Sequence, residues 1–145
     1  MASRSDDERV LNQMKKLLIL LILLLTTSCA GLNDWDYTLP NGYSVMHINS
    51  KKIIISYNGN EKTNAEIRSF VKSFVYDSRY VFAVCSPEKE SSDEIYYIID
   101  TMEHNLFGPF ENYCDFEEVA DSLGVSVPTN WYKTETDPNL LFSVN

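Results

Sequence analysis

The sequence predicts an α+β fold: an antiparallel β-meander of about six strands, in three hairpins, with one C-terminal helix packed on the sheet. Short runs rich in β-branched and aromatic residues recur between residues 43 and 107, and turn residues separate them. A single run with helical spacing follows at 115–124. Of the 145 residues, the 117 from residue 29 onward are a suitable length for one domain with a modest core.

An N-terminal segment, Lys15 to Cys29, has the layout of a secretory signal, because two lysines precede nine apolar residues at 17–25 and then small hydroxyl residues. The apolar run is well short of the roughly 20 residues that a membrane-spanning helix needs. Thr27-Ser28-Cys29 resembles the end of a bacterial lipoprotein leader, although Thr26 stands where leucine is usual. We therefore predict lipidation of Cys29, with an ordinary signal peptide or an uncleaved anchor as the alternative.

The residues in front of this signal are acidic where a signal peptide begins with basic residues. Met14, followed directly by lysines, is a better start, so we expect residues 1–13 to be a mistaken extension, with a real cytoplasmic extension as the alternative. The predicted organisation is then a lipoprotein signal peptide at 14–28, a tether at 29–39 and a single globular domain at 40–145.

The chain from Cys29 onward is strongly acidic. Its 117 residues hold 18 acidic and 8 basic side chains, a net charge of −10. Such a surface disfavours nucleic acid, which binds clustered Lys and Arg, and it offers no basic patch to anionic lipid. We therefore expect membrane attachment to come from the lipid on Cys29.

Two further cysteines, Cys85 and Cys114, are predicted to lie in a compartment where disulfides persist. The sequence leaves open whether they form a disulfide or serve as a half-buried strand residue and a packing residue at the start of a helix. Their spacing does not match paired metal ligands, so we expect no metal and no cofactor.

The first and third hairpins follow from alternation and turn residues. After the turn Pro40-Asn41-Gly42, strands are predicted at 43–48 and 52–57. The third hairpin joins 94–100 to 105–107, after a polar loop from Ser86 to Asp93.

The segment 63–76 supports two interpretations. Thr63-Asn64-Ala65-Glu66 is a capping-box pattern, and the apolar residues after it have helical spacing. However, 70–76 is rich in valine and aromatic residues, and Asp77-Ser78-Arg79 is typical of a turn into a second strand at 80–85. We predict a strand at 70–76, with a helix as the alternative.

The C-terminal helix is predicted from its caps. Asp115 and Glu118 form a capping box, Cys114 and Val119 occupy the positions of a hydrophobic staple, and Gly124 is a common terminator. The apolar stripe consists of Phe116, Val119, Ala120 and Leu123.

Several of these motifs occur together: the Cys29 leader, Trp35-Asp36-Tyr37, Pro40-Asn41-Gly42-Tyr43, Asp77-Ser78-Arg79-Tyr80, and the run from Tyr96 through Asp100 and Gly108-Pro109-Phe110 to Leu123-Gly124. Together they resemble a family of small bacterial lipoproteins whose domain has no assigned function. The resemblance covers most of the chain after Cys29 and implies no catalytic residues. The Ser28-Cys29 ending also resembles leaders common in Bacteroidota. Because Ala30 is not the aspartate that retains lipoproteins at an inner membrane, we expect an outer-membrane anchor, facing the periplasm or the exterior.

The sequence contains no catalytic signature. Its histidines, His47 on a strand and His104 in a turn, are not tied by any motif to a serine or cysteine nucleophile. We therefore do not expect an enzyme.

Aromatic residues are the remaining candidates for binding. Trp35, Trp131 and Tyr132 lie near the ends of the domain and could bind a protein or a glycan, with packing against the domain as the alternative. The predicted function is a non-enzymatic, lipid-anchored cell-envelope module that binds an envelope protein or glycan. The alternative is a small periplasmic inhibitor or immunity-type protein that blocks an enzyme through an acidic face.

Overall fold

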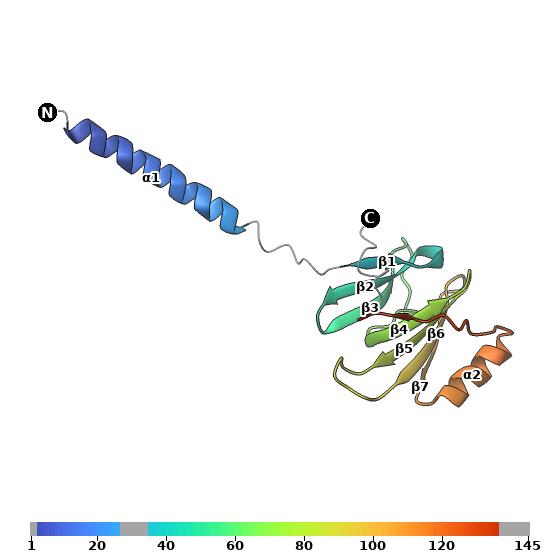
Figure 1. Cartoon of the computed structure of the whole chain (residues 1–145). Coiled ribbons are helices and arrows are strands. Elements are labelled where there is room, and N and C mark those ends of the chain that lie inside the picture. Colours follow the sequence, from blue (N-terminus) through green and yellow to red (C-terminus); the bar gives the residue numbers. More distant parts are fainter. Residues whose placement is uncertain (1–2, 27–34, 137–145) are drawn as a thin grey trace. The chain divides into compact units, whose positions relative to one another are not determined.

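The computed structural model describes residues 3–26 and 35–136, in two compact units (Figure 1). The unit Met1–Leu32 contains one helix, α1 (Ser3–Thr26), whose large apolar side chains from Leu17 to Ile22 are exposed. Among the described residues, no helix combines the length and apolarity needed to cross a membrane. Cys29 lies outside the described residues.

The second unit, Asn33–Asn145, begins with a three-stranded antiparallel sheet. Its strands are β1 (Asp36–Thr38), β2 (Tyr43–Asn49) and β3 (Lys52–Tyr57), in that spatial order, and the short 3₁₀ turn η2 (Pro40–Gly42) connects the first two. β1 pairs with β2, so residues 36–38 of the segment that the sequence assigned to a tether form a strand of this sheet.

A second antiparallel sheet has five strands in the order β7-β6-β5-β4-β8. Its members are β4 (Phe70–Tyr76), β5 (Tyr80–Ser86), β6 (Ile95–Asp100), β7 (Asn105–Phe110) and β8 (Tyr132–Lys133). This sheet confirms the strand prediction for residues 70–76, and the alternative of a helix there was wrong.

The α+β class and the three hairpins are confirmed, but their strands form two sheets instead of one meander. The separation occurs after β3, where residues 58–69 leave the regular ladder and keep only an isolated bridge between Ile55 and Ile67. β1 and β8 were not predicted, because strands of three and two residues are too short to show an alternating pattern.

The five-stranded sheet forms the middle of three layers, because both of its faces are buried. The central strand β5 alternates between the two faces. Its residues Val81, Ala83 and Cys85 pack toward the three-stranded sheet, and Tyr80 and Phe82 pack toward the C-terminal helix. This follows from the period of two in a strand. The helix, α2 (Tyr113–Ser122), buries Phe116 and Ala120 against this second face.

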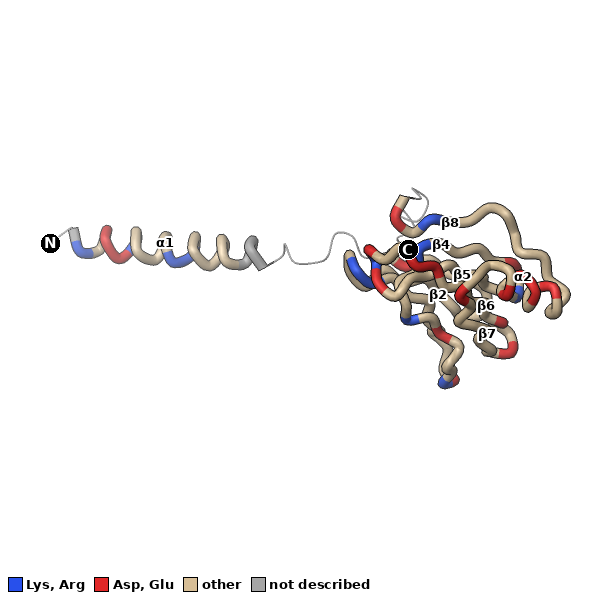
Figure 2. Tube along the Cα trace, turned by 90° about the horizontal axis from the view of Figure 1, so that it is seen from below, with Lys and Arg blue, Asp and Glu red and all other residues tan. Residues whose placement is uncertain are grey.

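The start of α2 differs from the prediction. Asn112, not Asp115, is the N-cap: its Oδ1 accepts the backbone N–H of Asp115 at 2.9 Å, and its Nδ2 donates to the Asp115 carboxylate at 2.8 Å. The helix therefore begins three residues earlier, and Cys114 lies exposed within its first turn instead of serving as a staple. Acidic residues and no basic ones lie along α2 (Figure 2).

The C-terminus of α2 matches the prediction. Gly124 has a φ of 72°, in the left-handed region that glycine adopts readily. The N–H of Gly124 donates to the carbonyl of Asp121, and that of Val125 donates to the carbonyl of Ala120. This pair of bonds is the Schellman motif.

The cap assignment gives a stability test. We expect Asn112→Ala to lower the free energy of unfolding by about 1 kcal/mol, because the N–H of Asp115 loses its acceptor. Asp115→Ala keeps that backbone N–H and its bond to Asn112, so the loss should be smaller. Urea denaturation of both variants measures the difference. A larger loss of unfolding free energy for Asp115→Ala than for Asn112→Ala would show that Asp115 is the N-cap.

Candidate functional site

A buried carboxylate joins the turns at one end of the five-stranded sheet. Asp100, the last residue of β6, is 4% exposed and receives the Arg79 guanidinium through Nε and Nη2 at 2.6–3.1 Å. The backbone N–H groups of Met102 and Glu103 donate to the same carboxylate. The bonds from Arg79 hold the pKa of the Asp100 carboxyl below its ordinary value, against the opposing effect of burial.

Residues around the Arg79–Asp100 ion pair connect η2 to the β4–β5 turn and to the β6–β7 turn. The Asn41 amide donates to Thr101 Oγ1 at 2.8 Å and to the carbonyl of Ser78 at 3.2 Å, and the Tyr43 hydroxyl lies 2.9 Å from His104 Nδ1. Asn41 and His104 both have a positive φ, 57° and 54°. We call Asn41, Tyr43, Arg79, Asp100, Thr101 and His104 the corner network. Strained residues of this kind persist only where the surroundings hold them, and here every polar side chain contacts another member.

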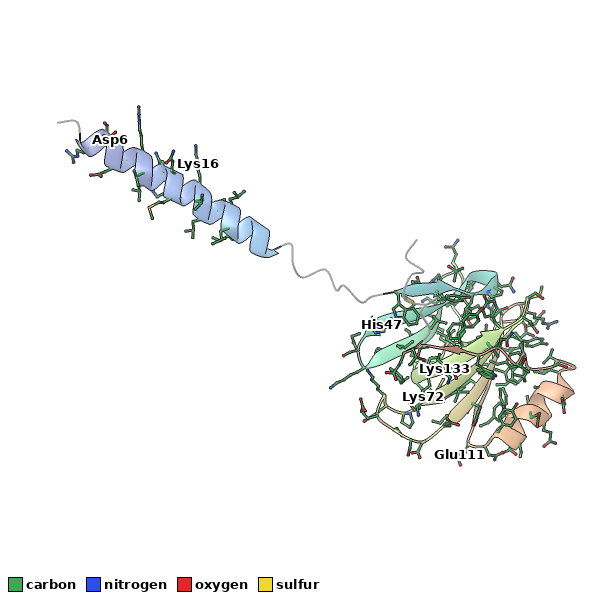
Figure 3. All side chains as sticks on the ribbon, in the orientation of Figure 1. Asp6, Lys16, His47, Lys72, Glu111 and Lys133 are labelled. Carbon is green, nitrogen blue, oxygen red and sulfur yellow. The ribbon has the colours of Figure 1, made fainter. Side chains whose placement is uncertain are left out.

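The other histidine, His47 of β2 (Figure 3), stacks on the ring of Trp35, with centroids 5.6 Å apart and an interplanar angle of 23°. Trp35 is only 7% exposed and belongs to the core between the sheets. Trp35 therefore packs within the domain, which is one of the two interpretations that the sequence left open, and is not an exposed binding residue.

Tyr132 belongs to an aromatic cluster that closes one side of the sandwich. Its ring lies 5.3 Å from Phe74, 5.5 Å from Tyr37 and 6.0 Å from Tyr76, and the hydroxyls of Tyr37 and Tyr76 are 2.9 Å apart. Burial, and then the neighbouring tyrosines, raises the pKa of Tyr37. We call these four residues the aromatic clasp. Because it joins the edge strands β1 and β8, Tyr132 is a packing residue.

The third predicted aromatic, Trp131, is half-buried and packs beside α2 with the core on the outer face of the sheet. None of the three candidates forms a flat exposed patch. Composition alone could not separate them from the aromatics of the core.

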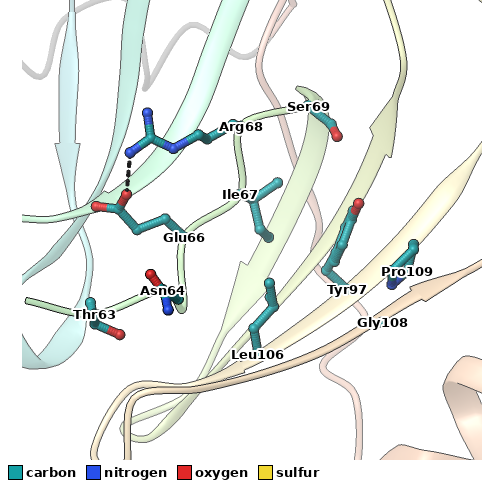
Figure 4. A pocket seen from close by; sticks show the side chains of 10 residues that line it. All are labelled: Thr63, Asn64, Glu66, Ile67, Arg68, Ser69, Tyr97, Leu106, Gly108 and Pro109. Atoms are coloured by element: carbon teal, nitrogen blue, oxygen red, sulfur yellow. Dashed lines mark hydrogen bonds and ion pairs between the residues drawn. The ribbon is translucent and has the colours of Figure 1, made fainter.

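The opposite side of the sandwich is open. A groove of about 400 Å³ lies between the irregular segment 63–69, next to β3, and the strands β6 and β7, of which β7 is at the edge of its sheet (Figure 4). We call it the edge groove. Its lining consists of Thr63, Asn64, Glu66, Ile67, Arg68, Ser69, Tyr97, Leu106, Gly108 and Pro109.

The edge groove combines an apolar floor with a polar rim. Tyr97 and Leu106 are half-buried at its base, and Arg68, whose side chain is 77% exposed, donates to Glu66 Oε2 at 2.8 Å. The groove is mainly polar, and the apolar side chains at its base are the part of it that resembles a typical ligand site. Nothing in the sequence singled out this site, because its walls come from separate segments of the chain.

Glu66 fixes the rim of the groove. Its Oε1 accepts the Ser56 hydroxyl at 2.8 Å and the backbone N–H of Tyr57 at 3.1 Å. Burial raises the pKa of the Glu66 carboxyl, but these bonds and the one from Arg68 outweigh it, and the pKa is lowered overall. The carboxylate thus holds the segment against β3.

The acidic loop from Ser86 to Asp93 is attached to the sheet at several points. Lys72 of β4 donates to the carbonyl of Ser91 at 2.7 Å, and Lys89 forms an ion pair with Glu135 at 3.1 Å. Glu88 and Glu90 remain exposed. The loop therefore presents its acidic side chains from a fixed backbone.

The two cysteines are free thiols in different environments. Cys85 is buried between the sheets, which raises the pKa of its thiol, and Cys114 is exposed on α2. The disulfide between Cys85 and Cys114, which the sequence left open, is not formed in the structure. Among the described residues, no three His, Cys, Asp or Glu side chains gather in a group that could hold a metal ion.

Comparison with known proteins gives one match. The family model described as a protein of unknown function (DUF3997) matches residues 40–132, which is more than half of the chain. No curated protein and no solved structure matches.

The corner network predicts a pH dependence. Because the native pKa of Asp100 lies below the unfolded value of about 3.9, the ion pair adds stability above that pH and loses it as the pH falls through the native pKa. Asp100→Asn should cost about 2 kcal/mol at neutral pH. This difference in stability should narrow as the pH falls below about 3.9 and on through the native pKa.

Urea denaturation of both proteins between pH 2 and pH 7 measures the gap. The exposed Asp121→Asn changes the net charge equally and is the control. A gap that stays constant over this range would show that the carboxylate charge is not what stabilises the corner.

Proposed function

We propose that this chain, which belongs to the DUF3997 family of proteins of unknown function, is a lipid-anchored cell-envelope module that binds a protein or glycan partner without catalysing a reaction. The edge groove carries this proposal. Within it, an apolar floor and a polar rim are jointly accessible to a partner.

The anchor rests on the leader. Lys15 and Lys16, the apolar residues 17–25 and the ending Thr27-Ser28-Cys29 form the three parts of a lipoprotein signal. A negatively charged domain is repelled by anionic lipid, so the lipid itself would hold the protein at the membrane. An outer-membrane location facing the periplasm or the exterior is part of the proposal.

The histidine contacts support a binding module over a hydrolase. A histidine that serves as a general base must have a nucleophile within reach. His104 is bound by the Tyr43 hydroxyl, and the ring of His47 stacks on Trp35. Both are engaged in packing of the sandwich.

The second candidate function is an inhibitor or immunity-type protein. It is favoured by the acidic loop, because Glu88 and Glu90 are exposed on a backbone that Lys72 and Lys89 hold in place. A rigid acidic protrusion can fill the cleft of an enzyme that acts on acidic substrates.

The anchor is tested by labelling cells with a radioactive fatty acid. We expect Cys29→Ala to abolish the label and to release the protein from the membrane fraction, because the thiol is the acceptor. Cys114→Ala, a change at an exposed thiol on α2, should keep both. Label retained by the Cys29 variant would refute the anchor.

Binding at the edge groove is tested by cross-linking in intact cells, capture of the protein and mass spectrometry. Asn64→Trp places a large ring at the rim of the groove, so we expect about tenfold less of a bound partner. Asn60→Trp adds the same ring at an exposed position that does not line the groove, and it should leave recovery unchanged.

Two outcomes would redirect the proposal. A partner that survives Asn64→Trp and is lost when Glu88 and Glu90 become lysine would favour the inhibitor. Equal recovery of every partner with all of these variants would refute a specific binding function.

A further inference from the structure

A second groove lies at the far end of β7. It has a volume of about 380 Å³ and is lined by Pro87, Asp93, Glu94, Ile95, Pro109 and Glu111. We call it the acidic groove. Its apolar lining comes from two prolines and an isoleucine, and its charged lining is three carboxylates with no lysine or arginine.

The carboxylates of the acidic groove lie on exposed residues of two loops, one before β6 and one after β7. Asp93 and Glu94 precede β6, and Glu111 follows β7, so the hydrogen-bonded pair of strands brings them together. Glu94 accepts the Tyr96 hydroxyl at 2.8 Å. Burial and this neighbouring carboxylate raise the pKa of Tyr96 to about 12. The local electrostatic potential is negative, and a cation in the groove would make it less negative.

The two grooves adjoin at one residue. Pro109 lines both, with Tyr97 and Leu106 on one side of it and Asp93, Glu94 and Glu111 on the other. In the edge groove the positive charge of Arg68 is paired with Glu66. The combined surface therefore has an apolar part whose charges are balanced and an acidic part whose charges are not.

We propose that an extended, basic segment of a partner protein binds along both grooves, with a Lys or Arg side chain in the acidic groove and apolar side chains on Tyr97 and Leu106. This inference rests on the proposed binding function and names its partner class. An extended chain reaches about 3.3 Å per residue, so alternate side chains can enter the two grooves while the backbone crosses Pro109.

Recognition depends on side chains more than on strand addition. β7 is the outer strand of its sheet, and an outer strand can accept a further strand. Pro109 has no N–H to donate, and the pairing of β7 with β6 shifts register between Tyr96 and Ile98. Only a short part of β7 keeps regular geometry, so the charge and the apolar floor have to supply the specificity.

Fluorescence anisotropy of the full chain in detergent tests the inference. The probes are three labelled peptides of about ten residues, roughly 33 Å when extended, that alternate valine with lysine, serine or glutamate. The Lys–Val peptide should bind, and its affinity should fall as salt is added. The Ser–Val and Glu–Val peptides should bind at least about tenfold more weakly.

Matched variants separate the groove from the net charge. The triple variant Asp93→Asn, Glu94→Gln, Glu111→Gln should weaken binding of the Lys–Val peptide by about tenfold. Glu117→Gln, Glu118→Gln, Asp121→Asn removes three charges from the exposed face of α2 and should weaken it less than about twofold.

Equal weakening by the two triple variants would overturn the inference, because it would show attraction to the net charge alone. Equal binding of the three peptides, or binding of glycans in place of peptides, would also overturn it. In either case the loss of a cellular partner with Asn64→Trp would still support the proposed binding function, so the two failures can be told apart.

Discussion

The buried carboxylate of Asp100 is the constraint on which the rest of the domain depends. A charge at 4% exposure is stable only when its hydrogen-bonding capacity is filled, and here one guanidinium and two backbone N–H groups fill it. The guanidinium comes from the turn before β5, and the N–H groups come from the turn after β6. A single side chain therefore fixes both hairpins of the large sheet at the same end.

The openness of the sandwich on one side follows from this arrangement. Asn41 connects η2 to both turns, which sets where β2 enters the small sheet. The aromatic clasp closes the side of the sandwich where β1, β4 and β8 lie. The three-stranded sheet is too narrow to cover the whole face of the five-stranded sheet. The segment 63–69 covers part of what remains, and the edge groove lies between it and β7.

Local chemistry in the sequence predicted the hairpins well, because strand alternation and turn residues act over a few neighbours. Prediction from local sequence failed where the interacting residues were far apart in the chain or where a strand was only two or three residues long. Asn112 was missed as the cap because Asp115, three residues on, offered an equally good pattern. Trp35 could not be assigned to the core from the sequence, because no local signal shows that β1 pairs with β2 and buries it. The edge groove could not be predicted, since its walls meet only in the folded chain.

The two walls of the edge groove differ in how they are held, and this difference bears on recognition. The wall with Tyr97 and Pro109 belongs to the β6–β7 hairpin, which the corner network fixes at its turn. The opposite wall is attached to β3 by two backbone bonds between Ile55 and Ile67, each 2.9 Å, and by the bonds of Glu66. The exposed residues of this wall, Asn64 and Arg68, can change without disturbing either sheet, whereas Ala65 and Ile67 are buried in the core between the sheets. Partner choice can therefore be set by the exposed positions of residues 63–69, while the fold is set by the corner.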